Sequence, residues 1–190
     1  RADQKYLYWL EKQESGRKTI YQNGIDLLPE TMSASTGIYG YGGCPYFLFE
    51  EGIVFSHEKE KSLYLLSKKS VKKLSVEEAS YADGVEYKGL KGFYIVREKK
   101  ELERSEIVFI NSFHEEKVVA SGRDFYSSLT ISPEGKKLVY LTWSLPFMPW
   151  QKTVLVERDI LPNGDLGKER DLLGEKKHQE ILFLSLFTNS

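Results

Sequence analysis

A pattern of short strands repeats along the chain, and this repeat limits the possible fold more than any other sequence feature. Short aromatic and β-branched runs alternate with turns that carry glycine. The second strand of each set is the clearest, and its successive centres lie about 46, 40 and 45 residues apart. These second strands are predicted at Tyr6–Glu11, Ile53–His57, Phe93–Arg97 and Lys137–Trp143. Four strands repeating every 40–50 residues or so is the spacing of a β-propeller blade.

The order of the strands favours a propeller over a β-sandwich, because a sandwich does not repeat sets of four with similar turns. The predicted fold is all-β: an incomplete β-propeller, with about three full four-stranded blades plus partial blades at both ends. Since propellers close as rings of typically four to eight blades, we expect the chain to be cut at both ends. The predicted divisions are a partial blade over residues 1–38, blades over 39–78, 79–121 and 122–175, and a further blade or aberrant tail over 176–190.

The other strands of the repeat follow from the same runs. They are predicted at Lys18–Gln22, Ile25–Leu28, Tyr46–Glu50, Ser62–Ser67, Val71–Leu74, Gly84–Tyr87, Glu106–Asn111, Lys117–Ala120, Tyr126–Ser132, Thr153–Arg158 and Arg170–Leu173, with Ile181–Phe187 as the first strand of a fifth set.

Charge and cysteine content exclude several classes of protein. The chain carries 27 Lys+Arg and 28 Asp+Glu, a net charge of -1, which gives no electrostatic reason to expect nucleic acid or an anionic membrane as partner. It has no apolar run of about 18 residues, so we expect no transmembrane helix. Its single cysteine excludes an intrachain disulfide framework. We expect a cytoplasmic protein.

One face of the predicted propeller carries the unusual sequences. In an up-and-down blade with strands A to D, the A–B and C–D turns lie on one face, and the B–C loops and D–A connections lie on the other. The D–A connections are predicted at Tyr39–Gly43, Tyr81–Gly84 and Gly122–Tyr126, and the longest B–C loop at Ser144–Lys152. We expect function on this face, because loops held by a rigid scaffold often carry it. The alternative is that these glycines and aromatic residues fix the packing between blades.

Three motifs on this face resemble the propeller of the prolyl oligopeptidase family, in particular its acylaminoacyl-peptidase and dipeptidyl-peptidase-like branch. They are YADG at 81–84, GRDFYSSLTISPEGKKLVYLTW at 122–143 and PFMPW at 146–150. The resemblance extends from YLYWLE at 6–11 to about Gly174, and its most specific element is the PFMPW loop after a strand ending in TW. The chain departs from the family pattern at Gly40, Cys44, Leu129, Leu145 and Gln151, mostly where the family has polar residues or proline.

The resemblance implies a non-catalytic propeller that gates access to a separate α/β-hydrolase domain with a Ser-Asp-His triad. The partners it implies are that hydrolase domain and short peptides, with no cofactor and no metal. The candidate substrate-facing residues are Tyr41, Tyr81, Asp83, Asp124, Phe125, Tyr126, Trp143, Met148 and Trp150. Two alternatives stay open: a stand-alone propeller scaffold for protein–protein interaction, and a carbohydrate-binding propeller that would use exposed aromatic residues.

No motif in the chain predicts catalysis of its own, and whether the chain is an enzyme stays open. The nucleophile-elbow pattern G-x-S-x-G does not occur. His57, His114 and His178 lie in charged surroundings without a second histidine at ligand spacing, so we expect exposed loop residues and no zinc site. For Cys44 we expect a buried, apolar role.

Four polar stretches are interpreted as connections between strands. Ser15–Thr19 resembles the end of a phosphate-binding loop but lacks its upstream glycine, which indicates a hairpin turn. Asn163–Gly167 lacks the calcium-loop pattern, which indicates a C–D turn. The mixed charges of Glu58–Lys61 and Arg97–Arg104 predict solvated loops.

Overall fold

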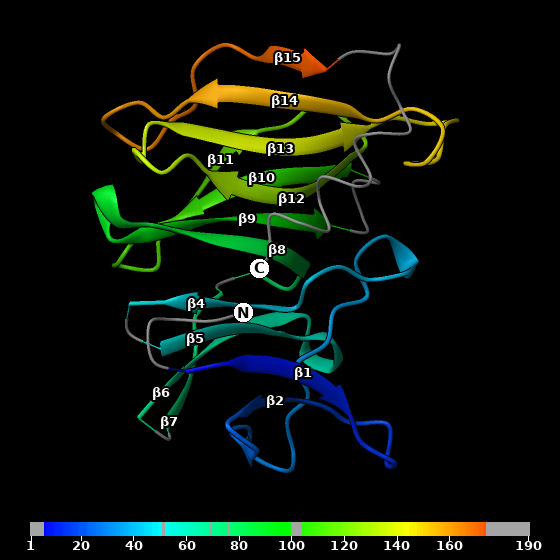
Figure 1. The fold of residues 1–190 in the computed structure, drawn as a ribbon, viewed down its shortest axis with the longest axis vertical. Coiled ribbons are helices and arrows are strands. Elements are labelled where there is room, and N and C mark those ends of the chain that lie inside the picture. Colours follow the sequence, from blue (N-terminus) through cyan, green and yellow to red (C-terminus); the bar gives the residue numbers. More distant parts are fainter. Residues whose placement is uncertain (1–5, 51, 69, 76, 100–103, 174–190) are drawn as a thin grey trace.

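The described part of the computed structural model, residues 6–50, 52–68, 70–75, 77–99 and 104–173, forms four antiparallel sheets that follow one another along the molecule (Figure 1). The first sheet holds β1 (Tyr8–Lys12), β2 (Lys18–Gln22) and β3 (Ile25–Asp26). The second holds β4 (Tyr46–Phe49), β5 (Gly52–His57), β6 (Ser62–Ser67) and β7 (Ser70–Lys73). The third holds β8 (Ser80–Tyr87), β9 (Gly92–Lys99), β10 (Arg104–Ile110) and β11 (Glu116–Ala120). The fourth holds β12 (Phe125–Ile131), β13 (Lys137–Trp143), β14 (Val154–Asp159) and β15 (Arg170–Leu173).

This architecture confirms the predicted fold class, an all-β incomplete propeller with three four-stranded sheets and a three-stranded one. Within each sheet, strands next to each other in the chain also pair with each other. Short 3-10 turns interrupt the connections at η1 (Ile38–Gly40), η2 (Glu58–Glu60) and η3 (Lys88–Leu90). None of the helices in the described residues is long and apolar enough to cross a membrane. The strand predicted at Ile181–Phe187 lies outside the described residues.

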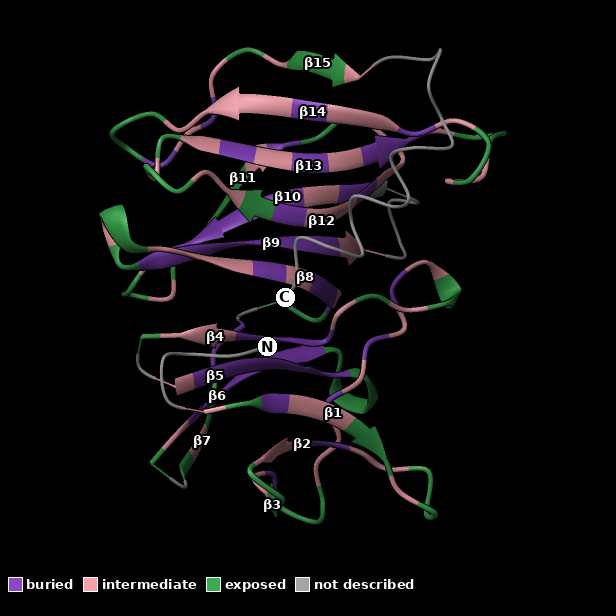
Figure 2. Ribbon diagram, in the orientation of Figure 1, coloured by how far each residue is buried: buried purple, intermediate pink, exposed green. Residues whose placement is uncertain are grey.

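Alternating burial explains why these segments form strands. In β13, Leu138, Tyr140 and Thr142 are each 0% exposed, while the residues between them are half-buried. The central strands β5, β6 and β9 are almost wholly buried (Figure 2), because sheets pack against both of their faces.

Three apolar clusters hold neighbouring sheets together, and each takes side chains from two adjacent sheets. The first strands of the four-stranded sheets also pack side by side, β4 against β8 and β8 against β12. The clusters include Tyr8, Ile20, Phe55 and Tyr64 between the first and second sheets, Val54, Leu65, Phe93 and Val108 between the second and third, and Tyr94, Phe109, Tyr126 and Tyr140 between the third and fourth.

The prediction that Tyr81–Gly84 forms a connection is wrong, because these residues lie within β8. The pairing of β8 with β9 shifts between Ala82 and Val85, and Asp83 there has φ 55°. Strand β12 has the same irregularity: its pairing with β13 shifts between Ser127 and Thr130, and Ser128 has φ 57°. These are β-bulges, and an Asp-Gly pair suits a bulge as well as a turn because both residue types tolerate positive φ.

The expectation that Arg97–Arg104 is a solvated loop is also wrong at its start, because Arg97 lies on β9 and is 4% exposed. Its guanidinium donates to Glu106 on β10 and to Glu116 on β11, each at 2.7 Å. Burial disfavours the charge, but these carboxylates outweigh it and raise the pKa of Arg97. The other mixed-charge stretch does form an exposed turn, η2.

Replacing Arg97 tests this buried ion pair. We expect Arg97→Ala to lower the free energy of unfolding by about 3 kcal/mol, because Glu106 and Glu116 lose a buried counter-charge. Urea unfolding followed by circular dichroism measures the change. The matched control is Lys88→Ala in the exposed turn η3, which should unfold like the wild type. An Arg97→Ala protein as stable as this control would contradict the assignment.

Candidate functional site

The connection between β3 and β4 leaves the first sheet, touches the other three, and only then enters β4. We call its residues 33–43 the strap. Ser35 forms a bridge with His57 of the second sheet, the backbone of Tyr39 contacts the third, and the Tyr39 hydroxyl contacts the fourth. In Figure 1 the strap is drawn in cyan, on the same side of the molecule as the loop between β13 and β14. Both segments belong to the face of the propeller that the sequence predicts to carry function.

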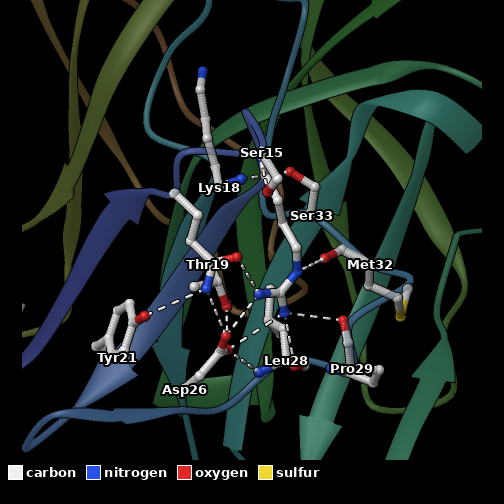
Figure 3. Close-up of polar contacts among 11 residues, drawn as sticks. Ser15, Lys18, Thr19, Tyr21, Asp26, Leu28, Pro29, Met32 and Ser33 are labelled. Atoms are coloured by element: carbon white, nitrogen blue, oxygen red, sulfur yellow. Dashed lines mark hydrogen bonds and ion pairs between the residues drawn. The ribbon is translucent and has the colours of Figure 1, made fainter.

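The chain just before the strap, with Asp26, Leu28 and Met32 (Figure 3), is anchored by Arg17. Its guanidinium donates to Asp26 at 2.6 Å, to the Leu28 carbonyl at 2.8 Å and to the Met32 carbonyl at 2.8 Å. Asp26 also accepts hydrogen bonds from the Thr19 hydroxyl and the Leu28 backbone N–H. Because β1 and β2 pair antiparallel on either side of this turn, the Ser15–Thr19 hairpin is confirmed. The side chains of Arg17 and Thr19 hold residues 26–32 against the first sheet.

The anchor predicts a pH dependence of stability. Burial alone would raise the pKa of Asp26, but the hydrogen bonds from Arg17, Thr19 and Leu28 outweigh it and lower the pKa. A carboxyl whose pKa is lower in the folded state stabilises the protein above its unfolded pKa, near 3.8, and this contribution disappears as the pH falls through the folded pKa.

Asp26→Asn should therefore be destabilised by about 1–2 kcal/mol at pH 6, and this deficit should shrink as the pH falls below about 4. Urea midpoints of the variant and the wild type from pH 3 to pH 7 give the comparison. Asp171→Asn on the exposed part of β15 is the control. A deficit that stays constant with pH would show that charge plays no part in the anchor.

The beginning of the strap covers His57. The backbone N–H of Ser33 lies 3.3 Å from Nδ1 of His57, and the Ser33 carbonyl lies 3.0 Å from the same nitrogen. His57 is only 4% exposed, so the expectation of an exposed loop residue is wrong. The strap buries it, and a charged local sequence gives no sign of a covering segment from elsewhere in the chain. His114 is half-buried in a turn, and His178 lies outside the described residues.

The tip of the strap is fixed to the fourth sheet by Tyr39. Its hydroxyl donates to the Tyr126 carbonyl at 3.0 Å and accepts from the Tyr126 backbone N–H at 3.1 Å. The Tyr39 N–H donates to the Glu98 carboxylate at 2.9 Å. Burial raises the pKa of Tyr39 far above its usual value, so the hydroxyl stays neutral and can donate and accept at once.

An aromatic cluster surrounds this tip. The ring of Tyr39 meets Phe125 edge-on, with centroids 4.9 Å apart, and meets Trp143 edge-on at 6.0 Å. Phe125 and Trp143 are stacked on each other, with centroids 5.2 Å apart. Edge-on and stacked pairs are favourable ring arrangements, so the cluster restrains the orientation of Trp143.

Asp83 joins the end of the strap to the bulges. One carboxylate oxygen accepts the Cys44 N–H at 2.8 Å, and the other accepts the Ser128 N–H at 2.9 Å. The Asp83 N–H in turn donates to the Cys44 carbonyl at 2.9 Å. A single side chain on β8 thus connects the segment that enters β4 with the bulge of β12. Cys44 itself is half-buried rather than buried as expected, and its thiol lies 3.3 Å from the Tyr46 carbonyl.

These contacts enclose a pocket of about 220 Å³ between the strap, the two bulges and the loop after β13. The walls take mostly aromatic, small and hydroxyl-bearing residues. The lining residues are Ile38, Tyr39, Tyr41, Gly42, Gly43, Ala82, Asp83, Tyr126, Ser127, Ser128, Leu141, Trp143, Pro149 and Thr153.

The structure brings four of the nine sequence-predicted residues to this pocket: Tyr41, Asp83, Tyr126 and Trp143. Phe125 does not line the pocket but stacks on Trp143. Asp124 accepts the Leu145 N–H at 2.9 Å, which shapes the loop after β13. Met148 and Trp150 lie in that loop but do not line the pocket. Tyr81 lies on β8, is 1% exposed, and its hydroxyl donates to the Glu77 carbonyl at 3.3 Å, so it lies in the core and not in a loop.

Several lining residues escaped the sequence analysis. Tyr39 lies in the Tyr39–Gly43 stretch that was singled out, but only Tyr41 was chosen from it. Ser127 on β12 pairs with Leu141 on β13, and Thr153 comes directly before β14. The register of these strands, which the sequence does not show, brings them to the pocket. Among the described residues there is no group of three or more His, Cys, Asp or Glu side chains that could hold a metal ion.

Asp83→Asn tests the connection between the sheets. Asparagine tolerates the positive φ but offers one acceptor oxygen instead of two, so one N–H, of Cys44 or of Ser128, loses its partner. We expect a loss of about 1–2 kcal/mol in the free energy of unfolding, measured by urea denaturation, and a larger loss for Asp83→Ala. With Asp171→Asn as the exposed control, equal stability of all three proteins would refute the connecting role.

Solved structures of other proteins are similar to this arrangement. Neither protein-family models nor curated protein sequences match the chain. A puromycin-hydrolyzing peptidase of Mycobacterium tuberculosis superposes with a TM-score of 0.79 and 26% identity over 91% of this chain and 30% of that protein. A puromycin hydrolase structure gives a TM-score of 0.76 and 20% identity over 91% of this chain and 32% of that protein. TolB from Acinetobacter baumannii gives 0.63 and 14% over 92% and 42%.

The chain therefore spans about a third of the length of the peptidases that it resembles. The likeness to TolB shows the propeller fold alone, since the sequences share few residues. The puromycin-hydrolyzing peptidases are members of the prolyl oligopeptidase family, and the chain matches their propeller portion. The resemblance to the N-terminal propeller portion of the prolyl oligopeptidase family is thus confirmed.

Proposed function

We propose that this chain is the non-catalytic, substrate-gating propeller portion of a serine peptidase, which admits short peptides to a separate α/β-hydrolase domain. The observation that carries the proposal is the likeness to the Mycobacterium tuberculosis puromycin-hydrolyzing peptidase, which extends over 91% of this chain at 26% identity. Because a fold hosts many functions, the likeness has to be supported by the local structure.

The strap supports a gating role. In a propeller the first strand of each blade lies nearest the ring axis, and here β4, β8 and β12 pack side by side in that position. The strap passes from the first sheet to the fourth at one end of these strands, held by Arg17, His57 and Tyr39 in turn. A segment held across the end of the inner strands restricts what can pass there, which is what a size filter for peptides requires.

A second candidate function is a scaffold for protein–protein interaction. It is favoured by large apolar side chains on the same face, since exposed apolar patches often mark interaction sites: Tyr41 is 60% exposed, Leu145 66% and Trp150 62%. The two functions differ in what the protein needs beside it. A gate needs a hydrolase domain in the same protein, whereas a scaffold needs none.

The test of the proposal begins with the DNA on both sides of the reading frame, which should encode an α/β-hydrolase domain with a G-x-S-x-G elbow. This chain alone should not hydrolyse aminoacyl or acyl-peptide chromogenic substrates. Joined to the hydrolase domain, it should make the rate fall steeply with peptide length, and Tyr39→Ala should relax that limit by freeing the tip of the strap.

The matched control is Phe113→Ala in the exposed turn between β10 and β11, which should keep the length limit. Hydrolysis by the isolated chain would overturn the non-catalytic role. A neighbouring region without a hydrolase domain would reject the gate in favour of the scaffold.

A further inference from the structure

The pocket under the strap has the size and chemistry of a site for one side chain. We propose that it binds a single uncharged aromatic side chain, phenylalanine or tyrosine, of a peptide. This inference rests on the proposed function, because it takes the ligand to be a peptide, and it deepens that function by assigning a residue preference to one place on the gate.

The volume of the pocket suits a single side chain. The pocket holds about 220 Å³, below the 300–1,000 Å³ or so that is typical of sites for whole drug-sized ligands. It is bounded on one side by the strap, which is fixed at Tyr39, and on the other by the bulges, which are fixed at Asp83. A fixed space of this volume suits one large side chain and leaves the rest of a peptide outside.

The walls of the pocket suit an aromatic ring. Trp143, Tyr39 and Pro149 supply flat apolar surfaces, and the contact of Trp143 with Phe125 restrains one of these surfaces. Gly42 and Gly43 also line the pocket and add no side chain to it, and Gly42 has φ 92°. Aromatic rings pair favourably with rings at an edge or in an offset stack, so these walls prefer an aromatic guest to an aliphatic one.

The charge of the lining residues disfavours a charged ligand side chain. Among the described residues that line the pocket, Asp83 is the one that carries a charge, and each of its oxygens accepts a backbone N–H group. A glutamate side chain would therefore lose water and meet a carboxylate of like charge, and burying such a charge is costly. A lysine ammonium would have to share the Asp83 oxygens with these N–H groups, so it would regain only part of the hydration that it loses. The pocket selects for neutral side chains.

Two serine hydroxyl groups in the pocket allow the bound side chain to end in a polar group. Ser127 and Ser128 both line the pocket and are half-buried, and within the described part of the chain neither side-chain oxygen has a hydrogen-bond partner. A hydroxyl both donates and accepts, so either serine can pair with a phenol. Tyrosine is thus accommodated together with phenylalanine.

The experiment measures binding of N-acetyl amino-acid amides to the 190-residue chain by isothermal titration calorimetry, with phenylalanine, tyrosine, alanine, lysine and glutamate as side chains. The phenylalanine and tyrosine amides should bind at least about tenfold more tightly than the alanine amide, because each buries a large apolar surface. The lysine and glutamate amides should bind no better than the alanine amide.

Two kinds of variant locate the binding. Ser127→Leu fills the pocket and should abolish the preference for aromatic amides, while Ser112→Leu in the exposed turn after β10 should keep it. Tyr41→Ala removes an exposed wall without disturbing the core, so it should weaken binding severalfold even if Ser127→Leu proves poorly folded by circular dichroism. Ser127→Ala combined with Ser128→Ala should weaken the tyrosine amide more than the phenylalanine amide.

Equal binding of the phenylalanine and alanine amides would overturn the inference, as would undiminished aromatic binding by both Ser127→Leu and Tyr41→Ala. These outcomes are independent of the gate itself, because they need no hydrolase domain. Length-limited hydrolysis by the joined protein without aromatic binding would reject the pocket and keep the gate. Aromatic binding by a chain without any neighbouring hydrolase would keep the pocket and reject the gate.

Discussion

The carboxylate of Asp83 is the interaction on which the rest of the functional face depends. It accepts one N–H from the segment that enters β4 and one from the bulge of β12, while Asp83 itself lies in the bulge of β8. The three inner strands belong to different sheets, so no ladder hydrogen bonds join them. Apolar packing between sheets is strong but not directional. The directional hydrogen bonds of Asp83 therefore set how the ends of these strands lie relative to one another.

The strap can be ordered because the hydrogen bonds of Asp83 fix the ends of these strands. A connection of this kind pays a conformational entropy cost for every residue it fixes, so it needs anchors spread along its length. Arg17 holds the chain before it, His57 contacts its first residue, Ser33, and the Tyr39 hydroxyl binds both backbone groups of Tyr126 at its tip. Each anchor belongs to a different sheet. The strap is consequently ordered only when those sheets keep their mutual positions, which couples the functional face to the packing of the propeller.

The sequence predicted the repeating strands well and the burial of polar residues poorly. The bounds of β2, β6, β13 and β15 follow from the alternation of apolar residues and from glycine-bearing turns, which are local signals. Arg97 and His57 were misplaced because their partners, Glu116 and Ser33, are distant in the chain. The pocket was predicted in part: Tyr41, Asp83 and Trp143 lie in unusual motifs, whereas plain residues such as Ser127 become pocket residues only through strand register.

Because its walls come from the strap and from two different sheets, the pocket is complete only in molecules whose strap is seated. The apparent affinity of a ligand for such a site is the intrinsic affinity reduced by the fraction of molecules in the competent state. The same linkage works in reverse, since a guest that binds only the closed arrangement stabilises it. A peptide with a suitable side chain would thus hold the strap in place, whereas an unsuitable one would leave it free to open. In the proposed function, binding of a side chain in the pocket and seating of the strap would then be one equilibrium, which the hydrogen bonds of Tyr39 and Asp83 adjust.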